Sequence, residues 1–155
     1  MVKPLTNPFL DAPLPLGSVI TTAGRRLYGE LDDALRAAGF SDLRAAHAPV
    51  FMGIAPEGSR LTDVAQRARM TKQAAGELVR HLTSRGYLTS RPDPADGRAR
   101  LILLTEHGWA AITTGQQVIR RFDRWLDDLL GADQVARLRE ALTLIAESEL
   151  GAPRA

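Results

Sequence analysis

The sequence predicts a mainly α-helical fold with a small β-hairpin, arranged as a winged helix-turn-helix with further helices at both ends of the chain. Three observations support this fold class. Two short segments with apolar stripes, 61–68 and 71–82, are separated by a tight turn. A stretch of alternating polarity, interrupted by proline, aspartate and glycine, follows them. Long amphipathic segments flank this middle part, and 155 residues suffice for one domain with a hydrophobic core.

The first helix of the pair is predicted from an apolar stripe at i, i+3, i+4 and i+7. Its members are Leu61, Val64, Ala65 and Ala68. We expect Thr62 to cap this helix, with an acidic residue following in the first turn, where the helix dipole favours negative charge.

The second helix has the same periodicity and clearer ends. Thr71 is expected to be its N-cap, and Gly86 supplies the left-handed residue beyond its C-terminus. The apolar stripe again has steps of three and four and consists of Ala75, Leu78, Val79 and Leu82. Two short helices joined by so tight a turn are expected to cross steeply, as helix-turn-helix units do.

The opposite face of the second helix is polar, and a helix of this size fits the major groove of DNA. Lysine, glutamine and arginine donate to phosphates and base edges, and Gln73 is suited to a bidentate contact with adenine. Gly76 is unusual, because glycine inside a helix costs about 1 kcal/mol relative to alanine; close approach to a DNA backbone would explain it. The alternative is an ordinary solvated face. The expected DNA-binding residues here are Thr71, Lys72, Gln73, Gly76, Glu77 and Arg80.

A hairpin is predicted next, with strands Leu88–Arg91 and Arg98–Leu104 joined by the turn-forming residues 92–97. On the return strand Ala99, Leu101 and Leu103 alternate with Arg98, Arg100 and Ile102, the period of a half-buried ribbon. We expect Asp96 to stabilise the wing by pairing with the neighbouring arginine and holding it outward. The basic residues expected to reach DNA from the hairpin are Arg91, Arg98 and Arg100.

Between residues 70 and 108 the sequence resembles the winged-helix regulators of the multiple-antibiotic-resistance (MarR) family. The resemblance implies a dimeric DNA-binding repressor or activator, often controlled by a small ligand, whose second helix reads the major groove. It also implies that Arg98 matches the wing arginine that enters the minor groove. Gly76 departs from the family, where serine or a similar residue is expected. The matching segments are Met70–Ala74, Glu77–Val79, Arg85–Leu88, Asp93–Ala99 and Leu104–Gly108.

The flanking helices are expected to form the dimer, because a small winged domain needs fewer amphipathic helices to cover its own core. A monomer in which these helices fold back is the alternative. A short helix near 43–52 is expected to be bent or shortened by Pro49. Thr105 is expected to cap a long helix that ends near Leu130, and Asp133 is expected to cap the last helix. The predicted domain organisation is an extended arm over 1–16 followed by a single domain over 17–155. Within that domain we expect the winged helix-turn-helix at about 57–105 and dimerisation helices at about 18–38 and 106–149.

Charge and composition agree with an anionic partner. Residues 57–100 contain nine Lys and Arg against five Asp and Glu, although the whole chain has a net charge of only +2. No cysteine is present, which excludes disulfides and thiol chemistry. No apolar run is long enough for a membrane span and no signal peptide is apparent, so we expect a cytoplasmic protein.

Other functions are weighed against DNA binding. The three histidines fall in different predicted elements, without metal-protease spacing or a glycine-rich phosphate loop, so we expect no enzyme, no metal and no cofactor. A winged-helix protein-interaction module and a sequence-tolerant architectural protein stay open. A small aromatic ligand between the lobes is a further hypothesis, although ordinary packing explains the same residues, namely Tyr28, His47, Phe51 and Trp109.

Overall fold

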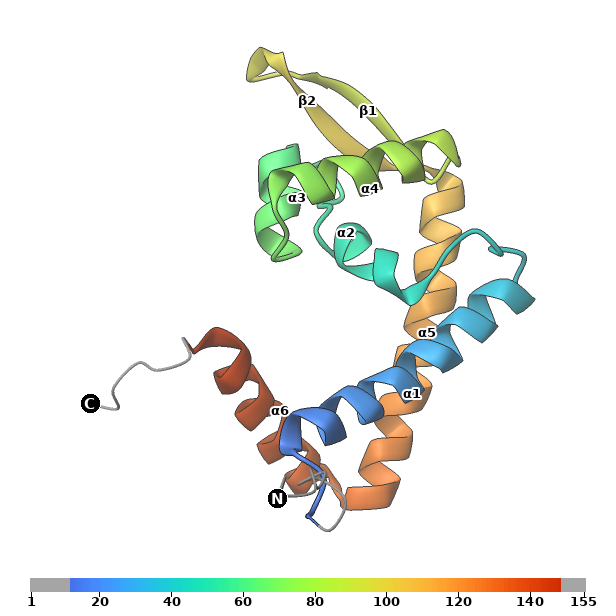
Figure 1. Cartoon of the computed structure of the whole chain (residues 1–155). Coiled ribbons are helices and arrows are strands. Elements are labelled where there is room, and N and C mark those ends of the chain that lie inside the picture. Colours follow the sequence, from blue (N-terminus) through green and yellow to red (C-terminus); the bar gives the residue numbers. More distant parts are fainter. Residues whose placement is uncertain (1–11, 149–155) are drawn as a thin grey trace, which may run out of the picture. The chain divides into compact units, whose positions relative to one another are not determined.

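The computed structural model describes residues 12–148 and is mainly helical, with one two-stranded antiparallel sheet among these residues. The predicted fold class is confirmed. The chain divides into two compact units, and the boundary lies inside a long helix between Gly115 and Gln116. The first unit contains the winged helix-turn-helix and is shown with the whole chain in Figure 1. The predicted N-terminal arm lies mostly in residues 1–11, outside the described residues.

The first helix, α1, spans Leu16–Ala37, close to the predicted 18–38. Its C-terminal half is anchored by Leu31 and Leu35, which are buried, whereas Val19 and Ile20 near its start are exposed. Gly39 ends the helix in the left-handed region with φ of 91°, which allows the following chain to turn back over the core.

The segment predicted as one short helix near 43–52 consists of two pieces. A 3₁₀ turn at Ala45–His47, named η1, leads directly into α2 at Ala48–Met52. Pro49 lies in the first turn of α2, where its missing N–H costs no helical hydrogen bond. Pro49 therefore lies in the first turn of a short helix and does not bend a longer one.

The helix pair is α3 at Leu61–Arg67 and α4 at Lys72–Ser84. The predicted Thr71 cap is confirmed, since its hydroxyl accepts from the Ala74 N–H at 3.1 Å. The predicted Thr62 cap is wrong, because the helix already begins at Leu61 and the N-cap is Arg60 in an extended conformation. The bridge between Ser59 and the second strand keeps the chain extended up to that point, which moves the helix start forward.

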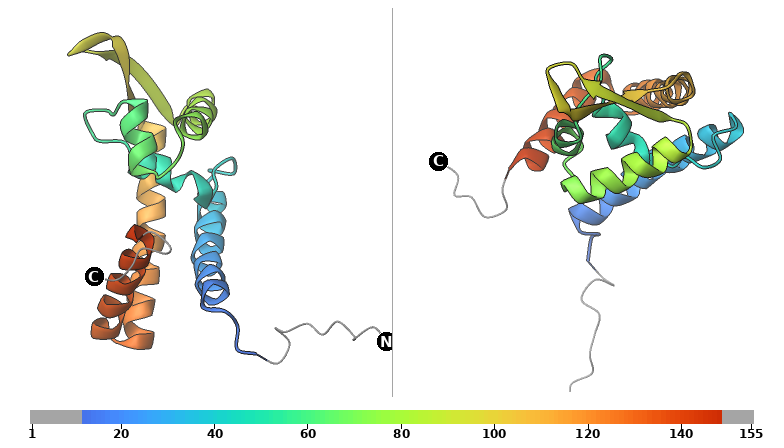
Figure 2. Two further views of the ribbon diagram at one scale, coloured as in Figure 1. Left: turned by 60° about the vertical axis from the view of Figure 1, so that its left-hand side comes forward. Right: turned by 90° about the horizontal axis from the view of Figure 1, so that it is seen from above.

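The hairpin strands are β1 at Leu88–Asp93 and β2 at Asp96–Leu104, both longer than predicted towards the tip. The tip extends beyond α3 and α4 (Figure 1; left view of Figure 2). Ile102 is the buried residue of β2, so the inward face at the base of the hairpin is not that of Leu101 and Leu103. Ile102 is enclosed because Ser59 pairs with it from a third segment, with N···O distances of 2.8 and 3.0 Å.

Tyr87 connects the base of the hairpin to the other elements of the first unit. Its ring stacks on His107 with centroids 4.4 Å apart and meets Phe51 edge-on at 6.2 Å. Its hydroxyl donates to Asp42, which lowers the pKa of that carboxyl; burial and the same hydrogen bond raise the pKa of Tyr87. Gly86, at φ of 80°, provides the predicted left-handed turn into this buried tyrosine.

Helix α5 spans Glu106–Leu130 and is capped by Thr105, as predicted, through a hydrogen bond from the Gly108 N–H to its hydroxyl at 3.1 Å. In the second unit the rest of α5 is followed by α6, Ala132–Glu147. The predicted Asp133 cap is wrong, because the N-cap is Gly131 with φ of 84° and Asp133 lies in the first turn. Val118 and Val135 are buried in this unit, whereas many of its large apolar residues are exposed, including Ile119, Leu129, Leu138, Leu144 and Ile145.

Candidate nucleic-acid interface

Helix α4 presents two distinct faces, because its apolar residues recur every three or four positions. Ala75 and Leu82 are completely buried. With 3.6 residues per turn, the residues farthest from that stripe form an outermost ridge of Gln73, Glu77, Arg80 and Ser84. These four residues are exposed, whereas Lys72 and Gly76 lie on the flank of the helix nearer the hairpin.

The flank of α4 borders a shallow groove shared with the start of α3 and with both strands. Leu61, Val79 and Ile102 contribute to its lining. Its charged lining residues are all cationic: Arg60, Lys72, Arg80 and Arg100. A groove of one charge sign between a helix and a basic ribbon suits a polyanion, since phosphates gain Coulomb attraction and displace bound cations.

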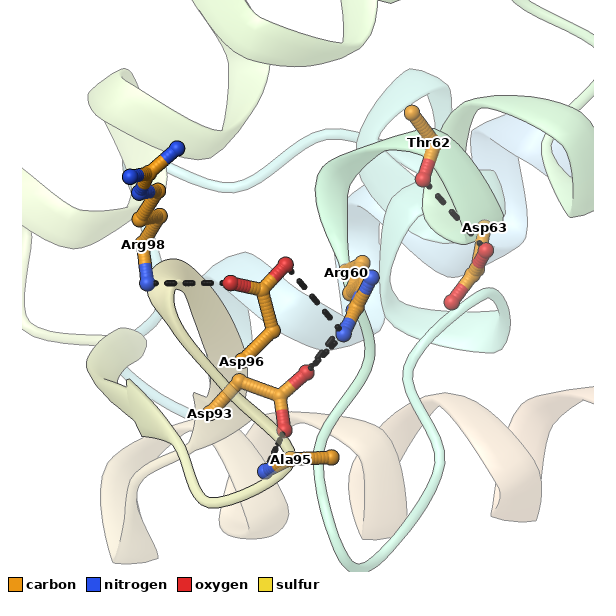
Figure 3. A network of polar contacts seen from close by, with 7 residues as sticks. All are labelled: Arg60, Thr62, Asp63, Asp93, Ala95, Asp96 and Arg98. Atoms are coloured by element: carbon orange, nitrogen blue, oxygen red, sulfur yellow. Dashed lines mark hydrogen bonds and ion pairs between the residues drawn. The ribbon is translucent and has the colours of Figure 1, made fainter.

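The wing is fastened to α3 by Arg60, whose guanidinium points at two aspartates of the hairpin tip (Figure 3). Its Nε lies 2.8 Å and its Nη2 2.5 Å from Oδ2 of Asp93, and Nη2 lies 3.9 Å from Oδ2 of Asp96. Asp93 also accepts from the Ala95 N–H at 2.9 Å, and this bond together with Arg60 lowers the pKa of its carboxyl. The buried carboxylate of Asp93 thus stabilises the tip by accepting from both a guanidinium and a backbone N–H.

Asp96 stabilises the turn in a different way from the one expected. Its Oδ1 accepts from the backbone N–H of Arg98 at 3.1 Å, and the guanidinium of Arg98 points away from it (Figure 3). An Asp carboxylate readily bonds the backbone two residues later, which is the physical reason for this arrangement. Arg98 is therefore exposed, and its direction is set by the backbone and not by an ion pair.

The three wing arginines, treated alike in the sequence analysis, differ in their surroundings. Arg91 donates through Nη2 to the carbonyl of Glu57 at 3.0 Å. Arg100 donates to the hydroxyl and the carbonyl of Ser90, both at 2.9 Å. The guanidinium of Arg98 is directed away from the aspartates of the hairpin tip (Figure 3). The geometry therefore makes Arg98 the wing arginine best placed for a partner.

Gly76 is not required by packing. A Cβ atom there would meet the side chain of Leu61 at 3.5 Å, an ordinary van der Waals contact. An alanine at position 76 would therefore fit within the protein and favour the helix by about 1 kcal/mol. Packing within the chain therefore does not explain the glycine, and close approach of a partner such as a DNA backbone stays the hypothesis for it.

Some residues of this surface were missed by the sequence analysis. Arg60 was not singled out, because its partner Asp93 is 33 residues away and no local pattern connects them. The small polar residues that complete the groove were also not named, since serine and threonine on an exposed face give no distinctive signal: Thr83, Ser84, Thr89 and Ser90.

The four residues named for a ligand are not brought together. Phe51 is buried against Tyr87, whereas the side chains of Tyr28 and Trp109 are exposed. His47 lies beside His81 of α4, with ring centroids 5.6 Å apart. None of the four lines the groove described above. The ligand hypothesis stays a prediction.

His47 is held in a form that resists protonation. Its Nδ1 accepts from the backbone N–H of Arg44 at 3.1 Å, so that nitrogen carries no proton. Burial, followed by the charges of His81 and Arg44, lowers the pKa of His47, and the opposing carboxylates Asp32 and Asp42 offset this only in part.

This environment predicts a pH dependence of stability. The pKa of His47 in the folded protein lies below its ordinary value of 6.5, so the unfolded chain takes up a proton more easily than the folded protein does. The free energy of unfolding is therefore highest above pH 6.5 and declines as the pH falls through the folded pKa. We expect the thermal midpoint to drop less between pH 7.5 and 5.5 in His47→Asn, whose amide oxygen replaces the Nδ1 acceptor. Equal drops in the wild type and in this variant, measured by circular dichroism melts, would contradict the assignment.

Two kinds of site are not found in the part of the chain that the structure describes. No group of three or more His, Cys, Asp or Glu side chains is arranged to hold a metal ion. No described helix is long and apolar enough to cross a membrane.

Comparisons with known proteins address the family and the fold. Residues 41–99, which include α3, α4 and most of the hairpin, match the family model described as MarR family. A search of curated proteins gives no match. The match to the family model overlaps the segments on which the family resemblance was based, and it confirms that resemblance.

Several solved structures have the same fold at low sequence identity. The transcriptional repressor CouR bound to a 23-mer DNA duplex has a TM-score of 0.70 at 23% identity, over 86% of this chain and 93% of CouR. A DNA complex of MepR from S. aureus has a TM-score of 0.74 at 16% identity, over 88% and 100%. Apo MarR from E. coli has a TM-score of 0.63 at 24% identity, over 86% and 98%.

Proposed function

From its MarR-family winged helix, we propose that this protein is a DNA-binding transcriptional regulator, and not an enzyme, that acts in the cytoplasm. The observation that carries the proposal is the groove between α4 and the hairpin, whose charged lining residues are all cationic. Helix α4 would enter the major groove through its outermost ridge, and the hairpin would follow the neighbouring backbone. The DNA complexes of CouR and MepR, which have this fold, support the assignment.

We assign the roles residue by residue. Lys72, Arg80 and Arg100, which line the groove, would face phosphates. Thr71 and Gly76 would lie close to the DNA backbone. Gln73 and Glu77 would face base edges, and Arg98 would reach the minor groove from the wing tip. Arg91 is bound to the loop at Glu57 and would act mainly by its charge. Asp96 and Asp93 would hold the wing in place.

The functional form would be a two-fold dimer. Large apolar side chains are exposed on the helices of both units, among them Val19 and Ile20 in the first and Leu129, Leu138 and Leu144 in the second. Exposed apolar residues on several helices favour burial against a second copy. Sedimentation velocity should give about twice the chain mass of 16.9 kDa; a species with the mass of a single chain would exclude the dimer.

Selection of bound duplexes from a random pool tests the function directly. A dimer of this kind should enrich an inverted repeat with half-sites about 10 base pairs apart, centre to centre. Binding without enrichment of any sequence would indicate an architectural protein, and absence of DNA binding would favour a protein-interaction module. Repression is the regulatory direction we propose, and it is tested by fusing the selected site to a reporter promoter.

The phosphate contacts make a separate prediction. Lys72→Ala and Arg80→Ala should each weaken binding to all sequences and reduce the slope of log affinity against log salt by about 0.9 per lost phosphate contact. Arg36→Ala is the charge-matched control, since Arg36 lies on α1 in an ion pair with Asp33. Fluorescence anisotropy at four salt concentrations measures the slopes, and equal slopes for all four proteins would exclude these contacts.

Relief by a small ligand is part of the proposal. CouR from Rhodococcus jostii RHA1, solved bound to p-coumaroyl-CoA, has a TM-score of 0.64 at 23% identity, over 88% of this chain and 95% of CouR. A ligand that weakens DNA binding must itself be bound more weakly by the same factor when DNA is present. Thermal-shift screening of aromatic acids and their thioesters tests this, and intact DNA binding without stabilisation by any compound would indicate a constitutive regulator.

A further inference from the structure

Glu77 occupies an unexpected position for an acidic side chain. It is the single carboxylate of α4, and it lies in the middle of the outermost ridge, between Gln73 one turn before and Arg80 about one turn after. This ridge is the part of the helix that would go deepest into the major groove. A carboxylate brought between two phosphate backbones loses water and is repelled, so it lowers affinity unless a donor compensates it.

Within the protein, Gln73 is a weak partner for this carboxylate. The amide nitrogen Nε2 of Gln73 lies 3.4 Å from Oε1 of Glu77, at the long end of hydrogen-bond distances. The contact orients the two side chains along the ridge. It leaves most of the acceptor capacity of the carboxylate unused, since an ionised carboxyl group has about four acceptor positions.

The major groove offers such a group only two kinds of base donor, the N4 amine of cytosine and the N6 amine of adenine. The adenine amine lies between two acceptors, N7 of its own base and O4 of the paired thymine, and both would repel the second carboxylate oxygen. The cytosine amine has the guanine O6 acceptor on one side and only a carbon-bound hydrogen on the other. A carboxylate therefore favours cytosine.

We propose that Glu77, oriented by Gln73, is a specificity-determining residue that accepts a hydrogen bond from the N4 amine of a cytosine in each half-site. The inference rests on the proposed function and adds the base that the helix selects. In this arrangement the cationic groove supplies affinity for any sequence, whereas the ridge penalises every base that presents no amine to Glu77. The carboxylate thus weakens binding to wrong sites more than it strengthens binding to the right one.

The test compares the wild type with Glu77→Gln, which keeps the size and the helical contact but removes the charge. Random-pool selection with the wild type should give one invariant cytosine per half-site in the region under α4. Replacing that C·G pair by T·A should weaken wild-type binding by about ten- to a hundredfold. The same replacement should change the affinity of Glu77→Gln by less than threefold, because an amide can also donate to thymine O4. Preferences at the other positions should stay as in the wild type.

Asp128→Asn is the matched control, since it removes one negative charge in the second unit, outside α4 and the hairpin. It should keep the cytosine preference of the wild type. If Glu77→Gln also keeps that preference, or if no cytosine is selected by the wild type, the inference is overturned while sequence-specific binding stands. If the wild type enriches no sequence at all, the proposed function fails as well.

Discussion

Replacing Gly108 by alanine should destabilise the first unit by at least about 3 kcal/mol. Gly108 lies in the first turn of α5, and a Cβ atom there would stand 2.3 Å from the carbonyl oxygen of Tyr87 and 3.1 Å from the Leu104 side chain. The carbonyl belongs to the backbone at the base of the hairpin, and it also accepts from the Thr105 N–H at 3.0 Å. Relief of the clash would therefore require α5 to move away from the core around Tyr87.

Gly115→Ala is the control for this substitution, because it changes the same residue type in the same helix. A Cβ atom at position 115 would meet Leu31 at 3.5 Å, an ordinary contact, so the alanine should stabilise the helix by about 1 kcal/mol. Urea titrations followed by circular dichroism give both free energies of unfolding. Equal midpoints for Gly108→Ala and the wild type would mean that the close approach of α5 to Tyr87 is absent in solution.

The need for glycine at position 108 could not be predicted from the sequence, whereas most of the helices could. Periodicity placed α1, α3, α4, α5 and α6 within a few residues, since each has an apolar stripe and most have a recognisable end. Thr71, Thr105 and Gly86 were identified because capping chemistry acts over three or four residues. Gly108 carries no such local signal, because the atom that excludes a side chain lies 21 residues earlier in the chain.

In the candidate site, too, some features follow from local sequence patterns and others depend on contacts between distant residues. The polar face of α4 follows from helical spacing alone, and the tip of the wing from its turn residues. Which wing arginine is directed outward depends on contacts that spacing does not reveal, such as those of Arg91 with Glu57 and of Arg100 with Ser90. The start of α3 was misjudged for a similar reason, since Thr62 has the right chemistry for a cap but Ser59 pairs with β2 and sets the start of the helix.

Arg98→Ala should weaken binding to the selected DNA by about ten- to a hundredfold without lowering the thermal stability of the protein. A charge-assisted hydrogen bond contributes about 1.5–3 kcal/mol, and the exposed Arg98 guanidinium forms its proposed contact with DNA and not with the chain. The wing itself should keep its shape, because Asp96 bonds the backbone N–H at position 98, which alanine retains. Fluorescence anisotropy for affinity and thermal melts for stability are the two measurements.

Two further variants distinguish a specific contact of Arg98 from the effect of its charge alone. Arg91→Ala removes the same charge from the same hairpin, but its guanidinium already bonds the Glu57 carbonyl, so its loss should weaken DNA binding several-fold less. Arg98→Lys keeps the charge and loses the planar fork; it should restore only part of the affinity if the guanidinium contacts base edges or a narrow groove, and all of it if charge alone matters. Equal losses for Arg98→Ala and Arg91→Ala would show that the hairpin attracts DNA by its total charge, and the tip would then have no defined place in the groove.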